Sequence, residues 1–347
     1  MTVRIGVIGV GMIGRDHVRR LSQVVAGAQV VAVTDVDPAR AQAVATEFTR
    51  SAPSGSTSIR PVRIAVHPTG QDVIADADVD AVVVCSWGPT HEEYVLAAIA
   101  AGKPVFCEKP LAETSDACAR IVRAETDAGR RLVQVGYMRR YDAAYRALKG
   151  VVDSGAIGAP LIVHCAHRNP DVPSHYTREM AITDTAVHEI DTMRWLLGEE
   201  IVGTQVLVPR RSRHGGELQD PLILLLELES GAIVDVEISV NIRYGYDIRS
   251  EVVGEDGTAA LGDASAVVVR REGRVSSPVP VDWRERFLGA YDTEFQEWVD
   301  AVAVGAPTGP SAWDGYAASS TAEAALAALN SGTRTAVKLI DRPDLYR

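Results

Sequence analysis

Short β-branched runs alternate with longer helix-like segments up to Gly136, and this alternation constrains the fold more than any other feature of the sequence. The runs are nearly continuous in apolar residues, as in parallel strands that are buried on both faces. They cover Val3–Gly9, Val30–Asp35, Ala81–Cys85, Pro104–Cys107 and Leu132–Gly136. The intervening segments have the length of crossover helices and cover Met12–Val25, Ala39–Phe48, Thr90–Ala101 and Ser115–Ala128. This half of the chain therefore predicts a doubly wound α/β sheet with right-handed connections.

After residue 137 the pattern changes to several strands with few helices between them. The expected strands are Leu161–Arg168, Thr204–Val208, Leu222–Leu228, Ala232–Val240, Ile248–Val253 and Ala266–Arg270. The expected helices are Ala143–Val152, Asp184–Leu197, Thr293–Val304 and Gly315–Asn330. A Ser230-Gly231 turn predicts a hairpin between two of the strands. We therefore expect a domain at 1–137 and an α+β domain at 138–347 with a large, mostly antiparallel, open-faced sheet. The segment Thr49–Arg63 is interpreted as an exposed loop.

Composition and charge exclude several classes of protein. The net charge of −11 disfavours nucleic acid and anionic membrane surfaces as partners. No uninterrupted apolar run is long enough to span a bilayer, and a strand pattern that begins at Val3 leaves no room for a signal peptide. The four cysteines are scattered without a C-x-x-C pair, which favours neither a disulfide scaffold nor a structural zinc site. A cytoplasmic protein is expected, with no metal site.

A glycine-rich turn between the first strand and the first helix indicates a dinucleotide site. In Gly9-Val10-Gly11-Met12-Ile13-Gly14, the first glycine permits a tight turn, the second lets the backbone approach a pyrophosphate, and the third permits close packing of helix and strand. The helix N-terminus offers N–H donors to the phosphates. Asp35 ends the second strand, where a carboxylate accepts hydrogen bonds from the ribose of NAD and repels the 2′-phosphate of NADP. NAD is therefore the expected cofactor.

Two further motifs carry groups that are suited to catalysis. Lys109, in Glu108-Lys109-Pro110, follows the fourth strand run, where ligands bind beyond the carboxyl ends of parallel strands. Asp184 and His188 are four residues apart, which places both on one face of an α-helix. Taken alone, a lysine at a turn also fits an ordinary surface position, and an Asp–His pair also fits a structural hydrogen bond.

Together these motifs resemble the glucose–fructose oxidoreductase/inositol dehydrogenase (Gfo/Idh/MocA) family over essentially the whole chain. The resemblance narrows to the inositol-oxidising branch at four segments, which are Met138–Asp142, His164–Pro170, Asp184–Asp191 and Tyr244–Ile248. It implies a Rossmann domain, an open-faced sheet domain, a homotetramer and inositol catabolism. It also implies NAD-dependent oxidation of inositol, myo-inositol foremost, at a secondary hydroxyl to the ketone. A scyllo- or D-chiro-inositol or pyranose dehydrogenase remains an alternative, and a non-catalytic NAD-binding sensor is a more remote one.

The resemblance also assigns roles to individual residues. The catalytic residues are Lys109, Asp184 and His188, with His188 as the general base. The expected cofactor contacts are Gly9, Gly11, Met12, Ile13, Gly14, Asp35, Ser86, Trp87, Glu108 and Lys109. The expected substrate contacts are Lys109, Arg139, His167, Asn169, Asp184, His188 and Tyr246. Strand alternation agrees for His167 and Asn169, which share a face, and sends His164 to the opposite one. We further expect Leu222–Leu228 and Ala232–Val240 to supply an apolar sheet face for subunit contact.

Overall fold

The computed structural model describes residues 2–49, 63–262 and 267–347. The chain forms two compact units. The first contains the chain up to Gly136 together with Asp292–Tyr316 and Ile340–Arg347, and the second contains Tyr137–Tyr291 and Ala317–Leu339. Two segments near the C-terminus thus belong to the first unit, which no local sequence pattern indicates. The predicted loop at Thr49–Arg63 lies, apart from its two end residues, outside the described residues.

A six-stranded parallel sheet organises the first unit. Its order is β3-β2-β1-β4-β5-β6, the arrangement of a dinucleotide-binding Rossmann sheet. The strands are β1 Val3–Ile8, β2 Ala28–Thr34, β3 Ala65–Val66, β4 Ala81–Val84, β5 Val105–Glu108 and β6 Val133–Gly136. Five of the six match the predicted runs, because strands buried on both faces consist mostly of apolar residues. The predicted α/β class is confirmed.

The helices that connect the strands of this sheet begin in two ways, three with a side-chain cap and the others without one. They are α1 Met12–Gln23, α2 Pro38–Phe48, α3 Gly70–Ala75, α4 His91–Ala100 and α5 Ser115–Asp127, with a 3₁₀ turn, η1, at Gly88–Thr90. The side chains of Asp37, Thr69 and Thr114 accept backbone N–H bonds at the starts of α2, α3 and α5. The short α3 and the two-residue β3 were not predicted.

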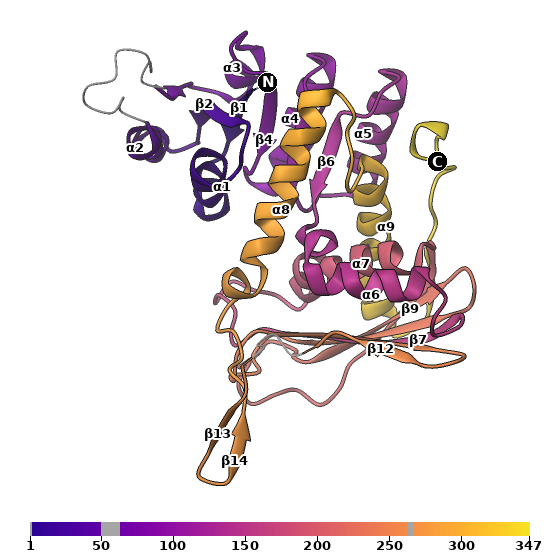
Figure 1. Ribbon diagram of the computed structural model, residues 1–347. Coiled ribbons are helices and arrows are strands. Elements are labelled where there is room, and N and C mark those ends of the chain that lie inside the picture. Colours follow the sequence, from indigo (N-terminus) through magenta and orange to yellow (C-terminus); the bar gives the residue numbers. More distant parts are fainter. Residues whose placement is uncertain (1, 50–62, 263–266) are drawn as a thin grey trace. The chain divides into compact units, whose positions relative to one another are not determined.

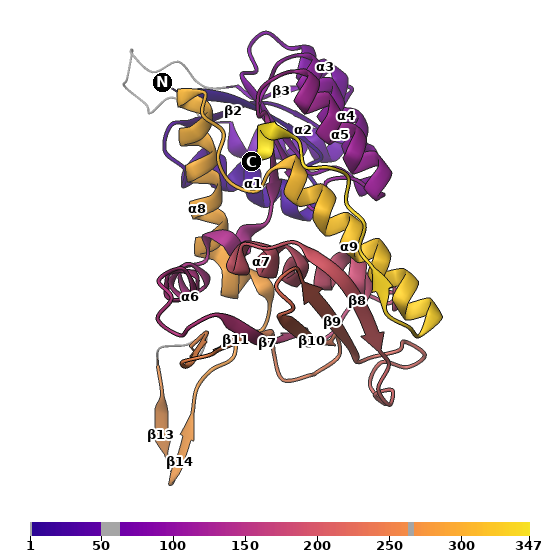
Figure 2. The ribbon, with the colours of Figure 1, turned by 90° about the vertical axis from the view of Figure 1, so that its right-hand side faces the viewer.

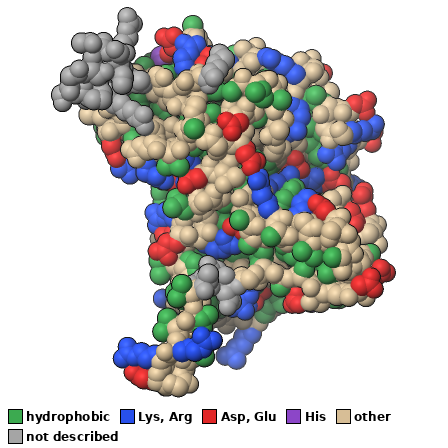
Figure 3. All heavy atoms as spheres, in the orientation of Figure 1, with side chains coloured by type: hydrophobic (Ala, Val, Ile, Leu, Met, Phe, Trp, Pro, Cys, Tyr) green, Lys and Arg blue, Asp and Glu red, His purple; other side chains and the backbone are tan. Residues whose placement is uncertain are grey.

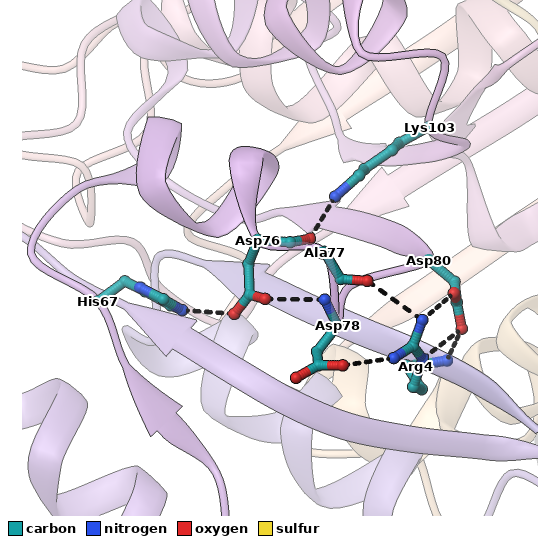
Figure 4. Close-up of polar contacts among 7 residues, drawn as sticks. All are labelled: Arg4, His67, Asp76, Ala77, Asp78, Asp80 and Lys103. Carbon is teal, nitrogen blue, oxygen red and sulfur yellow. Dashed lines mark hydrogen bonds and ion pairs between the residues drawn. The ribbon is translucent and has the colours of Figure 1, made fainter.

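An acidic cluster contacts the amino-terminal ends of the central strands of this sheet, at the opposite end of β1 from the glycine turn (Figure 4). Arg4 on β1 pairs with Asp80 at 2.8 Å, just before β4, and with Asp78 at 2.7 Å. Asp76 accepts a bond from His67 at 2.9 Å, and its carbonyl accepts one from Lys103. The Arg4 guanidinium lowers the pKa of Asp80. These contacts tie the starts of β1 and β4 together, and they leave the carboxyl ends of the strands to the ligand site.

A seven-stranded sheet organises the second unit. Its order is β12-β11-β7-β10-β9-β8-β15, and every pair except β7 with β10 is antiparallel. The strands are β7 Pro160–Arg168, β8 Ile201–Leu207, β9 Leu222–Leu228, β10 Ile233–Ser239, β11 Asp247–Gly254, β12 Thr258–Ala260 and β15 Thr335–Ala336. The turn at Ser230-Gly231 joins β9 and β10, as predicted. The predicted α+β class with a mostly antiparallel sheet is confirmed.

Helices cover one face of the second sheet (Figures 1 and 2). They are α6 Ala143–Asp153 and α7 Val187–Leu197, preceded by the 3₁₀ turn η2 at Met138–Tyr141 and the π-helical segment η3 at Ala181–Ala186. Two long helices have residues in both units, α8 Trp283–Val304 and α9 Ala312–Ser331, and the 3₁₀ turn η4 at Asp344–Tyr346 lies near the C-terminus. No described helix covers the opposite face of this sheet (Figure 1).

The outer face of this sheet mixes apolar and charged side chains, so the expectation of an apolar face holds only in part. Leu222, Leu224, Leu226 and Leu228 of β9 are buried, and the same strand face of β10 is buried as well. Charged pairs also cross the outer face, including Arg168–Glu237 and Arg168–Asp247. Because residues alternate between faces, the four leucines at even positions of β9 supply the covered face, and Ile223, Leu225 and Glu227 turn outward. On the neighbouring strands Ile162, Leu207 and Ile233 are also exposed on the outer face.

A small hairpin extends away from the second sheet (Figures 1 and 2). Its strands are β13 Val269–Arg271 and β14 Arg274–Ser276. A strand was expected at Ala266–Arg270, of which Ala266 lies outside the described residues.

Basic and acidic side chains are interspersed over the face of the molecule shown in Figure 3. Among the described helices, none is long and apolar enough to cross a membrane.

Candidate active site

The glycine turn after β1 has the geometry that a bound pyrophosphate requires. Gly9 has φ +86°, and a Cβ there would lie 2.6 Å from the backbone of Ser86. A Cβ on Gly14 would lie 2.0 Å from the carbonyl oxygen of Gly9, so the start of α1 packs directly on the turn. A Cβ on Gly11 would meet no heavy atom within 4 Å, so the backbone of Gly11 faces open space. The three glycines therefore have the separate physical roles that the motif predicts.

Asp35 is fixed at the end of β2 by backbone donors. Its Oδ2 accepts the N–H of Val10 at 2.8 Å, and its Oδ1 accepts the N–H of Asp37 at 2.9 Å. Arg40 donates to Oδ1 at 3.1 Å. The carboxylate thus connects the glycine turn to the start of α2 and presents a negative charge beside the turn.

A cavity of about 680 Å³ opens at the carboxyl ends of β1, β2 and β4. Its walls include Gly9, Gly11, Asp35, Ser86 and Trp87, all of which were predicted to contact the cofactor. Arg40 and Tyr94 also line it and were not assigned to the site. Val36 and Trp87 expose 98% and 77% of their surface there, so apolar groups flank the carboxylate. An open cradle of glycine backbone, a ribose-binding carboxylate and apolar walls fit the adenosine diphosphate half of NAD.

Glu108, which precedes Lys109, takes part in a buried polar network. His17 Nε2 lies 2.7 Å from Glu108 Oε1, and Arg20 Nη1 lies 2.8 Å from His17 Nδ1. Arg20 also pairs with Asp292 at 2.7 Å. Since arginine only donates, Nδ1 of His17 accepts and its Nε2–H donates to Glu108. Burial lowers the pKa of His17. Burial alone would raise the pKa of Glu108, but the contacts with His17 and Lys109 together lower it.

Glu108 and a second histidine hold the turn that carries Lys109. The backbone N–H of Lys109 donates to Glu108 Oε2 at 3.2 Å, and a Cβ on Gly136 would come within 3.2 Å of that carboxylate. His91 contacts the carbonyl of Pro110 through Nδ1 at 2.7 Å and that of Ser86 through Nε2 at 2.9 Å. The Lys109 turn is therefore fastened to the end of β4, beside the cavity.

In the second unit, Asp184 and His188 lie on two consecutive helical segments, the first π-helical and the second α-helical. Asp184 belongs to the π-helical η3, whereas His188 is the second residue of α7. A π-helix has a wider turn than the α-helix assumed above, so the spacing of four alone does not set their relative direction. Asp184 is exposed and His188 is half-buried. Single π-helical turns occur frequently at functional sites.

Arg139 and His167, predicted substrate contacts, meet at a buried carboxylate that the sequence analysis left out. Glu189 Oε1 pairs with Arg139 Nη1, and Glu189 Oε2 lies 3.0 Å from His167 Nδ1. Arg139 Nη2 lies 3.1 Å from the same nitrogen. The His167 ring centre lies 6.4 Å from that of His188 and 5.7 Å from that of Tyr246. Four of the predicted residues are thus neighbours in this unit.

The remaining predicted residues occupy the ends of strands. Asn169 continues the line of β7, since its N–H donates to the carbonyl of Ser239 at 2.9 Å. Tyr246 is buried just before β11, and burial raises its pKa to about 12. His164 lies on the outer sheet face and pairs with Asp235 at 2.5 Å, on the opposite side from His167, as alternation predicts.

Comparison with known families matches both halves of the chain. Residues 3–137 match the model of an oxidoreductase family with an NAD-binding Rossmann fold, and residues 149–339 match the C-terminal alpha/beta domain of the same family. The chain belongs to the Gfo/Idh/MocA oxidoreductase family. It is therefore an NAD-dependent oxidoreductase, and its first unit is the NAD-binding domain.

Individual relatives are similar over the full length. Inositol 2-dehydrogenase 3 of Saccharopolyspora erythraea is 57% identical, with 100% of this chain and 98% of the relative covered. The inositol 2-dehydrogenase of Burkholderia lata is 54% identical, with both chains fully covered. The crystal structure of myo-inositol dehydrogenase from Lactobacillus casei, in complex with NAD(H) and myo-inositol, is 41% identical with a TM-score of 0.94, and both chains are fully covered.

Proposed function

We propose that this chain oxidises inositol, myo-inositol foremost, at a secondary hydroxyl to the corresponding inosose with NAD. The observation that carries the proposal is the full-length identity of 57% and 54% to inositol 2-dehydrogenases. The 41% identical structure with NAD(H) and myo-inositol bound supports the same cofactor and substrate. We further propose that the enzyme acts in inositol catabolism as a cytoplasmic homotetramer.

NAD supplies the hydride acceptor at nicotinamide C4. The glycine turn, Asp35, Ser86 and Trp87 would hold its adenosine diphosphate half, and the expected contact set also includes Met12, Ile13, Glu108 and Lys109. An alcohol is far too weak an acid to ionise at neutral pH, so a base must take the hydroxyl proton as the hydride leaves. Histidine suits this role at neutral pH, and His188 is the proposed base.

Asp184 and Lys109 complete the proposed catalytic set. Asp184 orients the imidazole of His188 and stabilises its protonated form, or else hydrogen-bonds the substrate. The ammonium of Lys109 donates to the reacting oxygen and stabilises the negative charge that develops there. Arg139, His167, Asn169 and Tyr246 form the proposed inositol-binding set.

The test is NADH formation at 340 nm with purified enzyme over a panel of myo-, scyllo- and D-chiro-inositol and several hexoses. NAD and NADP are compared in parallel. Turnover of an inositol with NAD, above that of any hexose, supports the proposal. A preference for a pyranose sugar would favour the alternative substrate class. Binding of NAD without turnover of any polyol would favour a sensor.

A further inference from the structure

The far end of the cofactor cavity, beyond Asp35, is lined by side chains that no sequence motif assigns to NAD. The glycine turn would hold the pyrophosphate and Asp35 the adenosine ribose, and the purine leaves that ribose on the side opposite the pyrophosphate. In the strand order β3-β2-β1, β3 lies on the far side of β2 from the glycine turn. The purine therefore extends towards residues 68–71, which follow β3 and line the cavity together with Glu93 and Tyr94 of α4.

This end of the cavity is built where the starts of α3 and α4 meet. Thr69 caps α3, because its side chain accepts a backbone N–H from the first turn of the helix. A Cβ on Gly70 would overlap the ring of Tyr94, so the glycine permits the close approach of the two helices. Gln71, the next residue of α3, thereby lies beside Glu93 in the first turn of α4, and its Nε2 donates to Glu93 Oε1.

The hydrogen bond between Gln71 and Glu93 determines what this wall offers to a base. A carboxylate only accepts hydrogen bonds, so the amide of Gln71 presents its NH₂ group to Glu93. The amide oxygen of Gln71 and the second carboxylate oxygen of Glu93 remain, and neither accepts a hydrogen bond from another described residue. Both side chains are exposed and line the cavity. The wall therefore offers two hydrogen-bond acceptors, one of them charged.

We propose that Gln71 and Glu93 recognise the 6-amino group of the adenine of NAD. That amino group carries two N–H donors, which match the two acceptors. Hypoxanthine and guanine carry a carbonyl oxygen at the same position, and this oxygen would face a carboxylate without a proton between them. The pair thus selects the purine, whereas Asp35 acts on the ribose. The inference rests on the binding of NAD and is independent of which polyol the enzyme oxidises.

Nicotinamide hypoxanthine dinucleotide tests the proposal, because it differs from NAD only in its purine, where a carbonyl replaces the 6-amino group and N1 carries a proton. Isothermal titration calorimetry of the purified enzyme gives the Kd of each dinucleotide. Wild type should bind the hypoxanthine dinucleotide roughly tenfold more weakly than NAD, because a hydrogen bond to a charged acceptor is lost. Glu93→Gln should reduce this ratio to less than about threefold, since the amide oxygen still accepts from Gln71 and the NH₂ group donates to a 6-oxo purine.

Glu92→Gln is the matched control. Glu92 precedes Glu93 in α4 but pairs with Arg120 of α5 and is not part of the cavity wall. This variant removes the same charge from the same helical turn and should keep the wild-type ratio of Kd values.

Three outcomes would overturn the proposal. They are equal binding of both dinucleotides by wild type, an unchanged ratio in Glu93→Gln, and an equal fall of the ratio in Glu92→Gln, which would show a general effect of charge. None of these measurements requires the polyol substrate, so a failure of the proposed function leaves this test intact.

Discussion

Replacing His17 by leucine tests the buried network behind Lys109. Leucine keeps the apolar contacts, because the His17 ring packs against Phe295 with ring centres 4.4 Å apart. It removes the donor to Glu108 Oε1 and the acceptor for Arg20 Nη1, both of which are buried. Leaving a buried polar group without a partner costs about 1–3 kcal/mol, and more where it is charged. We therefore expect His17→Leu to lower the free energy of unfolding by about 3–5 kcal/mol, the range for breaking a buried pair.

Calorimetry of the enzyme without NAD measures this loss. A change of 1 kcal/mol shifts the Tm of a domain of this size by about 2–4 °C, so a decrease of roughly 6–20 °C is expected. Arg15→Gln is the control in the same helix, because its ion pair with Glu47 is solvent-exposed and is worth at most about 1 kcal/mol. A loss below about 1 kcal/mol in His17→Leu would show that the network does not stabilise the fold.

The difference in Tm between wild type and His17→Leu should depend on pH. Burial lowers the pKa of His17 in the folded state, whereas the unfolded chain titrates near 6.5. The stability contributed by neutral His17 is therefore fully present above pH 6.5 and is lost as the pH falls below it towards the folded pKa. The Tm gap between wild type and His17→Leu should narrow between pH 7.5 and 5.5. A gap that widens in acid would show that His17 is charged in the folded protein.

Three further predictions concern the proposed reaction and assembly. His188→Ala should lower kcat by about 10²–10⁴ with a nearly unchanged Kd for NAD, and Lys109→Ala should lower kcat at least as much. A His188→Ala enzyme that keeps more than about a third of wild-type kcat would assign the base role to another group. Asp35→Ser should narrow the preference for NAD over NADP, measured as the ratio of kcat/KM values, because it removes the charge that repels a 2′-phosphate; wild-type enzyme that used both cofactors alike would refute this role. Light scattering at micromolar protein should return the mass of a tetramer, and a monomer mass would refute the assembly.

Local sequence pattern predicts most of the fold, because the buried strands of the first unit are mostly apolar and its glycine turn has a fixed spacing. It does not predict β3 and α3, since two residues of strand and six of helix leave no periodic signal. It places the start of α8 near Thr293 rather than Trp283, because the first turns of that helix mix arginine and glutamate with exposed positions. The direction of the β9 leucines depends on which face the helices cover, and this is a tertiary property.

The sequence likewise predicts some residues of the candidate site and not others. Motif spacing identifies residues whose backbone or chemistry is locally specified, such as Gly9 with its positive φ and Asp35 at the end of a strand. It does not identify Glu189, because a glutamate in a helix usually lies on a solvent-exposed face. Only the meeting of η2, β7 and α7 shows that this side chain is buried between Arg139 and His167. Buried polar partners that are distant in sequence are therefore what the pattern leaves out.

The two units place a similar trio beside each proposed catalytic residue, and the trios differ in the ring nitrogens that they use. Glu108 precedes Lys109 and contacts His17 and Arg20, whereas Glu189 follows His188 and contacts His167 and Arg139. In the first trio the carboxylate and the guanidinium meet different nitrogens of the imidazole, at 2.7 and 2.8 Å, so both nitrogens take part in holding the turn. In the second trio both groups meet the same nitrogen, Nδ1, at 3.0 and 3.1 Å. The first arrangement therefore uses both ring nitrogens of His17 within the network, whereas in the second the contacts of the carboxylate and the guanidinium converge on Nδ1 of His167.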